Sequence, residues 1–109
     1  MCEADRDNEG KPELSYMLTF PNAWKSFAAV CMSGARKYSR GNYLKGAPLS
    51  QYQDCLLRHL LAWANGEDID PDSKCHHLAH VIWNALCLLE MAITQPERDD
   101  RMNQKVING

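Results

Sequence analysis

The sequence lacks an excess of charge of either sign. Lys and Arg total 12 and Asp and Glu total 14, which gives a formal net charge of −2. A broad nucleic-acid surface normally needs a basic excess, so we expect no nucleic-acid polymer as a partner. A small anion is compatible with this balance, because a phosphate group needs only local cations.

Long apolar runs and paired cysteines are also missing. No run approaches the about 18–20 apolar residues of a membrane span. Residues 1–11 are polar and acidic, where a secretory signal would be basic and then apolar. We therefore expect a cytoplasmic chain with no membrane partner. The cysteines number 5, an odd count without a CxxC pair, which favours reduced thiols over a disulfide framework.

What the sequence does contain is helical periodicity. Apolar residues at helical spacing predict three helices, over residues 23–38, 48–65 and 72–94. Pro48 suits the first turn of the second helix, and Gly66 suits a left-handed cap at its C-terminal end. Asp70 or Asp72 could N-cap the third helix, with Pro71 in its first turn. Since no strand is predicted, the expected fold is all-α, an antiparallel helical bundle.

The expected organisation is one helical domain with polar ends. Residues 1–13 form a flexible N-terminal arm, residues 14–95 the helical domain, and residues 96–109 a charged C-terminal tail. The third predicted helix is apolar nearly all the way round, which a chain of this size could hardly cover alone. We therefore expect oligomerisation, as a homodimer or homotetramer, to complete the bundle.

Polar residues interrupt this apolar pattern at one end of the predicted bundle. Two antiparallel helices with a short connection would bring His59 near His80, and Glu67 and Asp70 near His77. Asn84 follows on the same stripe of the third helix, and buried polar groups of this kind need partners. Carboxylate and amide oxygens suit Mg²⁺ or Mn²⁺, whereas imidazoles suit softer ions or act on a phosphate.

A second polar group follows the first helix. Lys37 stands at the helix end, and Asn42 and Lys45 lie in the Gly-containing loop after it. Such cations can hold phosphates, while Tyr38 or Tyr43 could stack on a base.

Structural alternatives exist for both groups. A cation at a helix C-terminus also opposes the helix dipole, a histidine on an apolar face is commonly a core residue, and the acidic residues could form a solvated turn. Cys55 and His59 lie four residues apart on one predicted helix, and Cys75 lies close to His77 and His80 on the next. A zinc site is nevertheless disfavoured, because there is no CxxC pair and Cys75 and His80 do not share a face with His77 closely enough for a closed tetrahedral site.

Several strings occur in a fixed order: GARKY at 34–38, NYxKG at 42–46, RHLLAWxxGEDxD at 58–70, HLAHxxxN at 77–84 and LLE at 88–90. Their order and spacing resemble a phage and bacterial family of N-terminal-type dATP/dGTP diphosphohydrolase domains, regarded as MazG-like. The resemblance covers about residues 10–90, and its opening includes Lys11.

The resemblance implies an all-helical, oligomeric, Mg²⁺-dependent enzyme that cleaves a deoxynucleoside triphosphate to the monophosphate and pyrophosphate. The expected cytoplasm is that of the host if the chain is phage-encoded. Carried over by position, the implied catalytic residues are Glu67, Asp70, His59 and His80. The implied metal ligands are Glu67, Asp70, His77, His80 and Asn84. The implied substrate-binding residues are Lys11, Lys37, Tyr38, Asn42, Lys45 and Arg58.

One departure from the MazG-like pattern keeps other functions open. That superfamily binds metal through paired acidic helices, whereas the corresponding helices here carry Arg58-His59 and His77, His80 and Asn84. An alternative is therefore a non-catalytic nucleotide-binding sponge that sequesters a signalling nucleotide. A third interpretation is a helical interaction module whose histidines are only structural.

Overall fold

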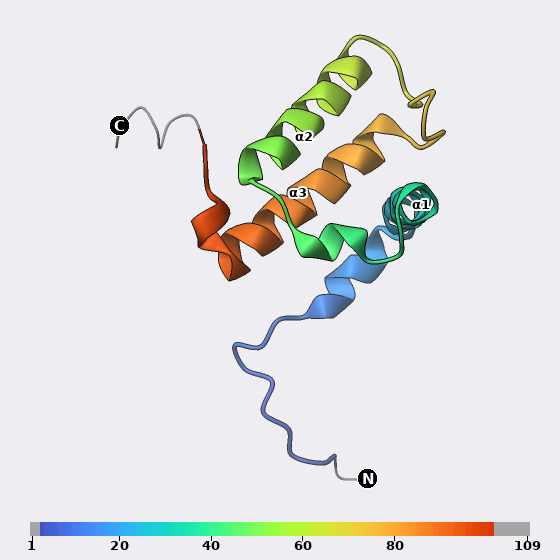
Figure 1. Ribbon diagram of the computed structural model, residues 1–109. Coiled ribbons are helices and arrows are strands. Elements are labelled where there is room, and N and C mark those ends of the chain that lie inside the picture. Colours follow the sequence, from blue (N-terminus) through green and yellow to red (C-terminus); the bar gives the residue numbers. More distant parts are fainter. Residues whose placement is uncertain (1–2, 102–109) are drawn as a thin grey trace.

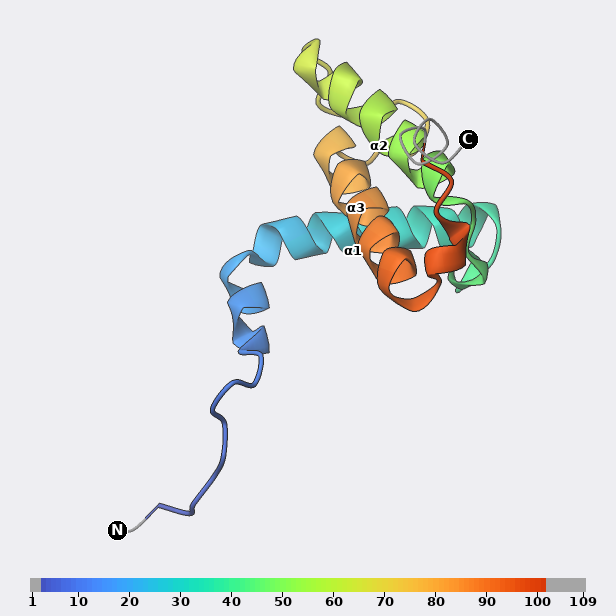
Figure 2. The same ribbon diagram turned by 90° about the vertical axis from the view of Figure 1, so that its left-hand side faces the viewer.

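A computed structural model describes residues 3–101 of the chain. Its α-helices and 3₁₀-helices (η) are, in order, η1 Leu14–Thr19, α1 Pro21–Lys37, η2 Asn42–Lys45, α2 Leu49–Ala64, α3 His77–Thr94 and η3 Pro96–Arg98. Within this range there is no strand, only an isolated antiparallel bridge between Ile69 and His76. Helices α2 and α3 lie side by side as an antiparallel pair, and α1 crosses α3 (Figures 1 and 2). The predicted all-α fold is confirmed.

Helix α2 ends as the sequence predicts. Gly66 has φ +101°, a conformation that favours glycine. The Gly66 N–H donates to the Trp63 carbonyl at 2.9 Å and the Glu67 N–H donates to the Ala62 carbonyl at 3.0 Å, which is the pattern of a Schellman cap. This cap turns the chain and places Glu67 immediately beyond the helix. Pro48 is the N-cap residue of α2 and not part of its first turn.

The predicted start of the third helix is wrong. Helix α3 begins at His77 and not at Asp72, and its N-cap is His76, whose Nδ1 accepts the Leu78 N–H at 3.0 Å. The reason is a short hairpin that the sequence pattern did not indicate. The Asp70 N–H donates to the Cys75 carbonyl and the His77 N–H to the Asp68 carbonyl, each at 2.8 Å.

Inside that hairpin the backbone turns through a left-handed residue. Lys74 has φ +64°, and its N–H donates to the Asp70 carbonyl at 2.8 Å. A left-handed residue interrupts helical geometry, so the segment cannot join α3. The carboxylate of Asp70 accepts hydrogen bonds within the turn, from the Asp72 N–H at 3.2 Å and the Ser73 hydroxyl at 3.0 Å, and caps no helix.

Two buried clusters lie on α3. Val30 of α1 packs with Cys75 and Ala79 near the start of α3, and a second cluster joins the start of α2 to the end of α3, formed by Leu49, Tyr52, Cys87 and Met91. Trp83 packs against both clusters, so it connects them. Helix α3 is therefore the central element of the bundle.

The chain after α3 returns to the start of α2. The Ser50 N–H and hydroxyl donate to the two carboxylate oxygens of Asp100 at 2.8 and 2.6 Å. Residues 102–109 of the expected tail lie outside the described part of the chain. The division into arm, domain and tail stays a prediction.

Helix α3 is long and apolar enough to cross a membrane by length and composition alone, within the residues searched. This corrects the expectation that no segment reaches that size. A core helix passes the same test, and α3 buries His77 and Asn84 while packing against two other helices. Only 28% of this stretch is buried in the described part of the chain, and Leu89 and Ile93 are exposed.

Candidate functional site: a histidine cluster and an aromatic groove

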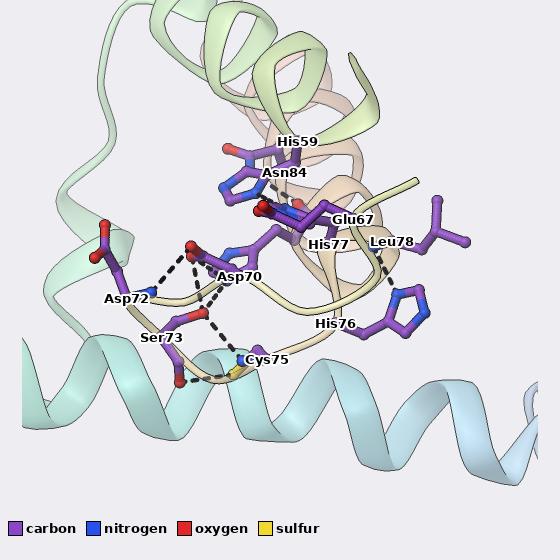
Figure 3. A network of polar contacts seen from close by, with 11 residues as sticks. His59, Glu67, Asp70, Asp72, Ser73, Cys75, His76, His77, Leu78 and Asn84 are labelled. Carbon is purple, nitrogen blue, oxygen red and sulfur yellow. Dashed lines mark hydrogen bonds and ion pairs between the residues drawn. The ribbon is translucent and has the colours of Figure 1, made fainter. Parts of the chain in front are cut away.

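Polar side chains from four segments converge at the closed end of the α2–α3 hairpin (Figure 3). His59 comes from the last turns of α2, Glu67 from the residue after the Schellman cap, and Asp70 from the turn. His77 and His80 come from the first turn of α3. We call His59, Glu67, Asp70, Ser73, His77 and His80 the histidine cluster.

One chain of hydrogen bonds in the cluster joins Glu67, His77 and His59. His77 Nε2 lies 2.6 Å from Glu67 Oε1, and His77 Nδ1 lies 2.8 Å from His59 Nδ1. The His77 side chain is buried, with the whole residue 4% exposed. Because both ring nitrogens of His77 have partners, its ring is fixed in one orientation.

A second chain joins His80, Ser73 and Asp70. His80 Nε2 lies 2.7 Å from Ser73 Oγ, which donates to Asp70 Oδ2 at 3.0 Å. His80 Nε2 itself is 3.6 Å from Asp70 Oδ2. Burial alone would raise the pKa of Asp70, but hydrogen bonds from the Asp72 N–H and the Ser73 hydroxyl lower it, so Asp70 is a carboxylate at neutral pH.

The two chains meet where His59 stacks on His80. Their ring centroids are 4.1 Å apart and their planes differ by 3°. Burial, followed by the nearby charge of His80, lowers the pKa of His59 to about 4. Burial also lowers the pKa of His80, against the opposing effect of Asp70. His59 is therefore neutral at pH 7, with a ring nitrogen able to accept a proton or bind a metal.

One group of potential ligands is close enough to share an ion. One ligand atom each from His59, Asp70 and His80 lies within 4.8 Å of the other two. No cysteine joins such a group within residues 3–101; the Cys75 thiol donates instead to the Ser73 carbonyl at 3.6 Å. Asn84 is 2% exposed, and its amide nitrogen donates to the His80 carbonyl of its own helix at 2.8 Å.

The second feature is a groove beside the C-terminal half of α1. It has a volume of about 830 Å³, and its lining includes Tyr38, Arg40, Asn42, Tyr43 and Trp83. Tyr43 meets Trp83 edge to face, with ring centroids 5.8 Å apart. Gly41 and Gly46, at φ +81° and +79°, reverse the chain on either side of η2 and so shape one wall. We call this feature the aromatic groove.

The predicted substrate-binding residues lie in different regions of the structure. Tyr38 and Asn42 line the aromatic groove, and exposed Arg58 lies close enough to His59 for its charge to lower the pKa of that histidine. Lys37 and Lys45 are exposed near the groove without lining it, and Lys37 Nζ lies 5.3 Å from the Tyr38 ring centre. Lys11 lies in the arm that leads away from the helices in Figure 2. None of these three lysines joins the histidine cluster.

Sequence reasoning assigned no role to two residues that matter here. Ser73 bridges His80 and Asp70, and its place on the polar stripe of the third predicted helix was the only available signal. Arg40 lines the aromatic groove and directly precedes Gly41. Its position could not be inferred without the path of that loop.

Comparisons with known proteins agree with the resemblance read from the sequence. A family model described as dATP/dGTP diphosphohydrolase, N-terminal, matches residues 3–101. The chain belongs to this family. A protein of Salmonella phage PMBT28 named dATP/dGTP diphosphohydrolase is 28% identical over 102 residues. That alignment covers 94% of this chain but 34% of the phage protein, so the chain spans about a third of its relative's length. No solved structure matches the chain.

Proposed function

We propose that this chain is a nucleotide diphosphohydrolase domain that cleaves a (deoxy)nucleoside triphosphate to the monophosphate and pyrophosphate with a divalent metal. The observation that carries the proposal is the convergence of His59, Asp70 and His80, whose potential ligand atoms lie within 4.8 Å of one another. Family membership and the name of the phage relative support the reaction type.

The chemistry of the cluster suits attack of water on the α-phosphorus. A bound divalent ion, Mg²⁺ or Mn²⁺ in the family expectation, would polarise phosphate oxygens and lower the pKa of a bound water. Such a water would lose its proton to solvent and attack the α-phosphorus while the bond to the bridging oxygen breaks and pyrophosphate leaves, with His59 serving as a ligand of the ion.

The other residues of the cluster have supporting roles in this proposal. Glu67 and His77 hold the ring of His59 through contacts of 2.6 and 2.8 Å. Arg58 stands beside His59 and can bind a phosphate with two parallel hydrogen bonds. The side-chain amide nitrogen of Asn84 donates to the His80 carbonyl, so in this proposal Asn84 stabilises the turn of α3 that carries His80.

We assign the aromatic groove to the nucleobase. Its volume of about 830 Å³ is within the size of small-molecule sites, and Tyr38, Tyr43 and Trp83 offer aromatic faces. Trp83 lies three residues after His80 on α3, about 5 Å along the helix axis. Lys37 and Lys45 near the rim add positive charge for the phosphates.

A second copy of the chain is the partner we propose for the outer face of the α2–α3 pair. Leu61 is 63% exposed and Leu89 is 60% exposed, although both are large and apolar. Gln53, Ala85 and Leu89 also line a groove of about 410 Å³ on this face. A homodimer or homotetramer would cover these side chains. Light scattering after gel filtration tests this, and Leu61→Lys with Leu89→Lys should give a monomer.

The alternative is a nucleotide sponge, which the exposed aromatic groove favours because the groove does not need the cluster in order to bind a base. Purified protein incubated with nucleoside triphosphates and cyclic dinucleotides, with Mg²⁺ or Mn²⁺ and with chelator, separates the two functions. Metal-dependent release of monophosphate and pyrophosphate supports the enzyme. Nucleotide depleted from solution and recovered intact after denaturation supports the sponge and rules out the enzyme.

A further inference from the structure

The donor set of the histidine cluster does not match Mg²⁺. We infer that His59, Asp70 and His80 bind a first-row transition ion such as Mn²⁺, Co²⁺ or Zn²⁺, and that Glu67 and His77 fix His59 in the tautomer that binding requires. The inference names the metal class of the proposed active site and so rests on the proposed function, but it concerns binding and not hydrolysis.

The types of ligand in this group favour a transition ion over Mg²⁺. Two imidazole nitrogens and one carboxylate oxygen form a borderline donor set, which suits transition ions, whereas Mg²⁺ prefers oxygen ligands in a near-ideal octahedron. Ligand atoms at about 2.1 Å from one ion lie roughly 3.0–4.2 Å apart. The present group spans up to 4.8 Å, so small side-chain rotations would close it. Three protein ligands leave positions open for water or phosphate oxygens.

The hydrogen bonds of Glu67 and His77 fix the proton positions. A carboxylate only accepts, so His77 Nε2 carries the hydrogen that it donates to Glu67 Oε1 across 2.6 Å. A neutral imidazole has one donor and one acceptor nitrogen, so we take His77 Nδ1 as the acceptor of the hydrogen on His59 Nδ1 across 2.8 Å. His59 Nε2 is then left with its lone pair. Within residues 3–101 no hydrogen bond uses this atom.

This arrangement is an extended form of a common support for metal-binding histidines. Such a histidine usually donates its other N–H to a carboxylate or carbonyl, which fixes the tautomer and the ring orientation. Here the carboxylate of Glu67 acts through a second ring, that of His77, which is 4% exposed. Glu67 and His77 are therefore positioning residues for His59.

Ser73 marks where the ion would enter. Its Oγ lies 2.7 Å from His80 Nε2 and 3.0 Å from Asp70 Oδ2, two atoms that are themselves 3.6 Å apart. The hydroxyl donates to Asp70, so it accepts the hydrogen of His80 Nε2. An ion bound between these two atoms displaces the Ser73 hydroxyl and moves the His80 proton to Nδ1. Ser73 thus competes with the metal.

The test uses the full chain freed of metal by chelator and titrated with Co²⁺ and with Mg²⁺, without nucleotide. Visible absorption of bound Co²⁺ and calorimetry report binding. We expect one Co²⁺ per chain, no displacement by a hundredfold excess of Mg²⁺, and loss of binding in Asp70→Asn. Equal competition by Mg²⁺, or unchanged Co²⁺ affinity in Asp70→Asn, would overturn the inference.

The role of Glu67 is tested in the same titration. Glu67→Ala should weaken Co²⁺ binding by about 10–100-fold, and Glu67→Gln, which keeps an acceptor oxygen, should recover part of the loss. Nitrogen NMR of the imidazoles should show the Nδ1–H tautomer of His59 in the native chain and a mixture in Glu67→Ala. Glu90→Gln, on an exposed position of α3, is the matched control. An unchanged tautomer in Glu67→Ala contradicts the positioning role.

Ser73→Ala keeps the inference testable if the ligand variants fail to fold. Removing the competing hydroxyl should leave Co²⁺ affinity equal to or tighter than that of the native chain, and a loss of more than threefold would contradict the entry point. Hydrolysis is measured separately. Co²⁺ binding without turnover refutes the proposed reaction alone, whereas turnover with Mg²⁺ and no Co²⁺ binding refutes this inference alone.

Discussion

The histidine cluster and the aromatic groove use neighbouring parts of α3 in different ways. In the cluster, His77 is 4% exposed and both its ring nitrogens have partners. In the groove, Tyr38 is 65% exposed and Tyr43 is 41% exposed. Side chains held by hydrogen bonds suit the bond breaking that we propose for the cluster, and exposed aromatic faces suit the base binding that we propose for the groove.

The backbone explains this difference. The cluster lies between a Schellman cap and a hairpin in which the N–H groups of Asp70, Lys74 and His77 donate to backbone carbonyls, so its side chains start from fixed positions. The groove has a wall made of a short 3₁₀-helix between two glycines with positive φ, Gly41 and Gly46. The hydrogen-bonded side chains of the histidine cluster and the exposed aromatic surface of the groove follow from these two local structures.

The variant with the largest expected effect, Asp70→Asn, disrupts the histidine cluster and leaves the aromatic groove intact. Asp70→Asn removes the only charged ligand of the group formed with His59 and His80, so metal-dependent cleavage of the nucleotide should fall by about 100-fold or more. Nucleotide binding to the groove should change little. Asp68→Asn is the matched control, because Asp68 is exposed and supports the site through its backbone carbonyl. Equal losses in both variants would contradict the assignment.

A backbone change should act on the cluster indirectly. Gly66→Ala places a side chain at φ +101°, which should lower the free energy of unfolding by about 1–2 kcal/mol. It should also displace the Glu67 side chain, so turnover should fall by more than the loss of folded protein explains. Thermal melts alongside turnover measure both effects. Gly34→Ala, within α1 and with open space around it, is the control for the melts alone, because Gly34 also lines the aromatic groove. A Gly66→Ala protein as stable as the native chain would be inconsistent with the Schellman cap.

The reciprocal variant, Tyr38→Ala, alters the aromatic groove and leaves the histidine cluster intact. Tyr38→Ala removes an exposed aromatic face, and loss of one stacking contact should weaken nucleotide binding by about 5–10-fold, or roughly 1–1.4 kcal/mol. Metal binding should be unchanged. Tyr16→Ala, equally exposed in η1, serves as the control in fluorescence titrations. Normal nucleotide affinity in Tyr38→Ala would remove the groove from the substrate site.

The smallest expected effect concerns pH and the metal-free chain. The folded state holds the pKa of His59 at about 4, below the ordinary 6.5, so below pH 6.5 the unfolded chain binds a proton that the folded chain does not. Stability should therefore be complete above about pH 6.5 and fall as the pH drops toward 4. Because His59 is only half-buried, we expect a loss of about 1–2 kcal/mol. Melting temperatures in the presence of chelator measure it, and His59→Gln should flatten the curve.

Parts of the fold follow from local sequence, and these were predictable. Helix α2 and its Gly66 cap depend on residues next to one another in the chain. The start of α3 depends on the pairing of Asp70 with Cys75 and of Asp68 with His77, and no helical pattern reveals such pairing. The true N-cap, His76, is not a residue type that usually indicates one.

The candidate site, like the fold, could be predicted from the sequence only in part. Helical spacing and a short connection were enough to place His59 near His80 and Glu67 near His77, although their roles stay predictions. The position of Lys37 and Lys45 near a separate groove depends on how α1 crosses α3, which composition and spacing do not determine. The bridging role of Ser73 depends on the hairpin.

Phosphorus NMR of a deoxynucleoside triphosphate mixed with the native chain and Mn²⁺ tests the central claim most directly. The account predicts that monophosphate and pyrophosphate signals grow with time, stop on addition of chelator, and are absent with Asp70→Asn. A triphosphate spectrum that stays unchanged with each nucleotide and with both Mn²⁺ and Mg²⁺ would contradict it.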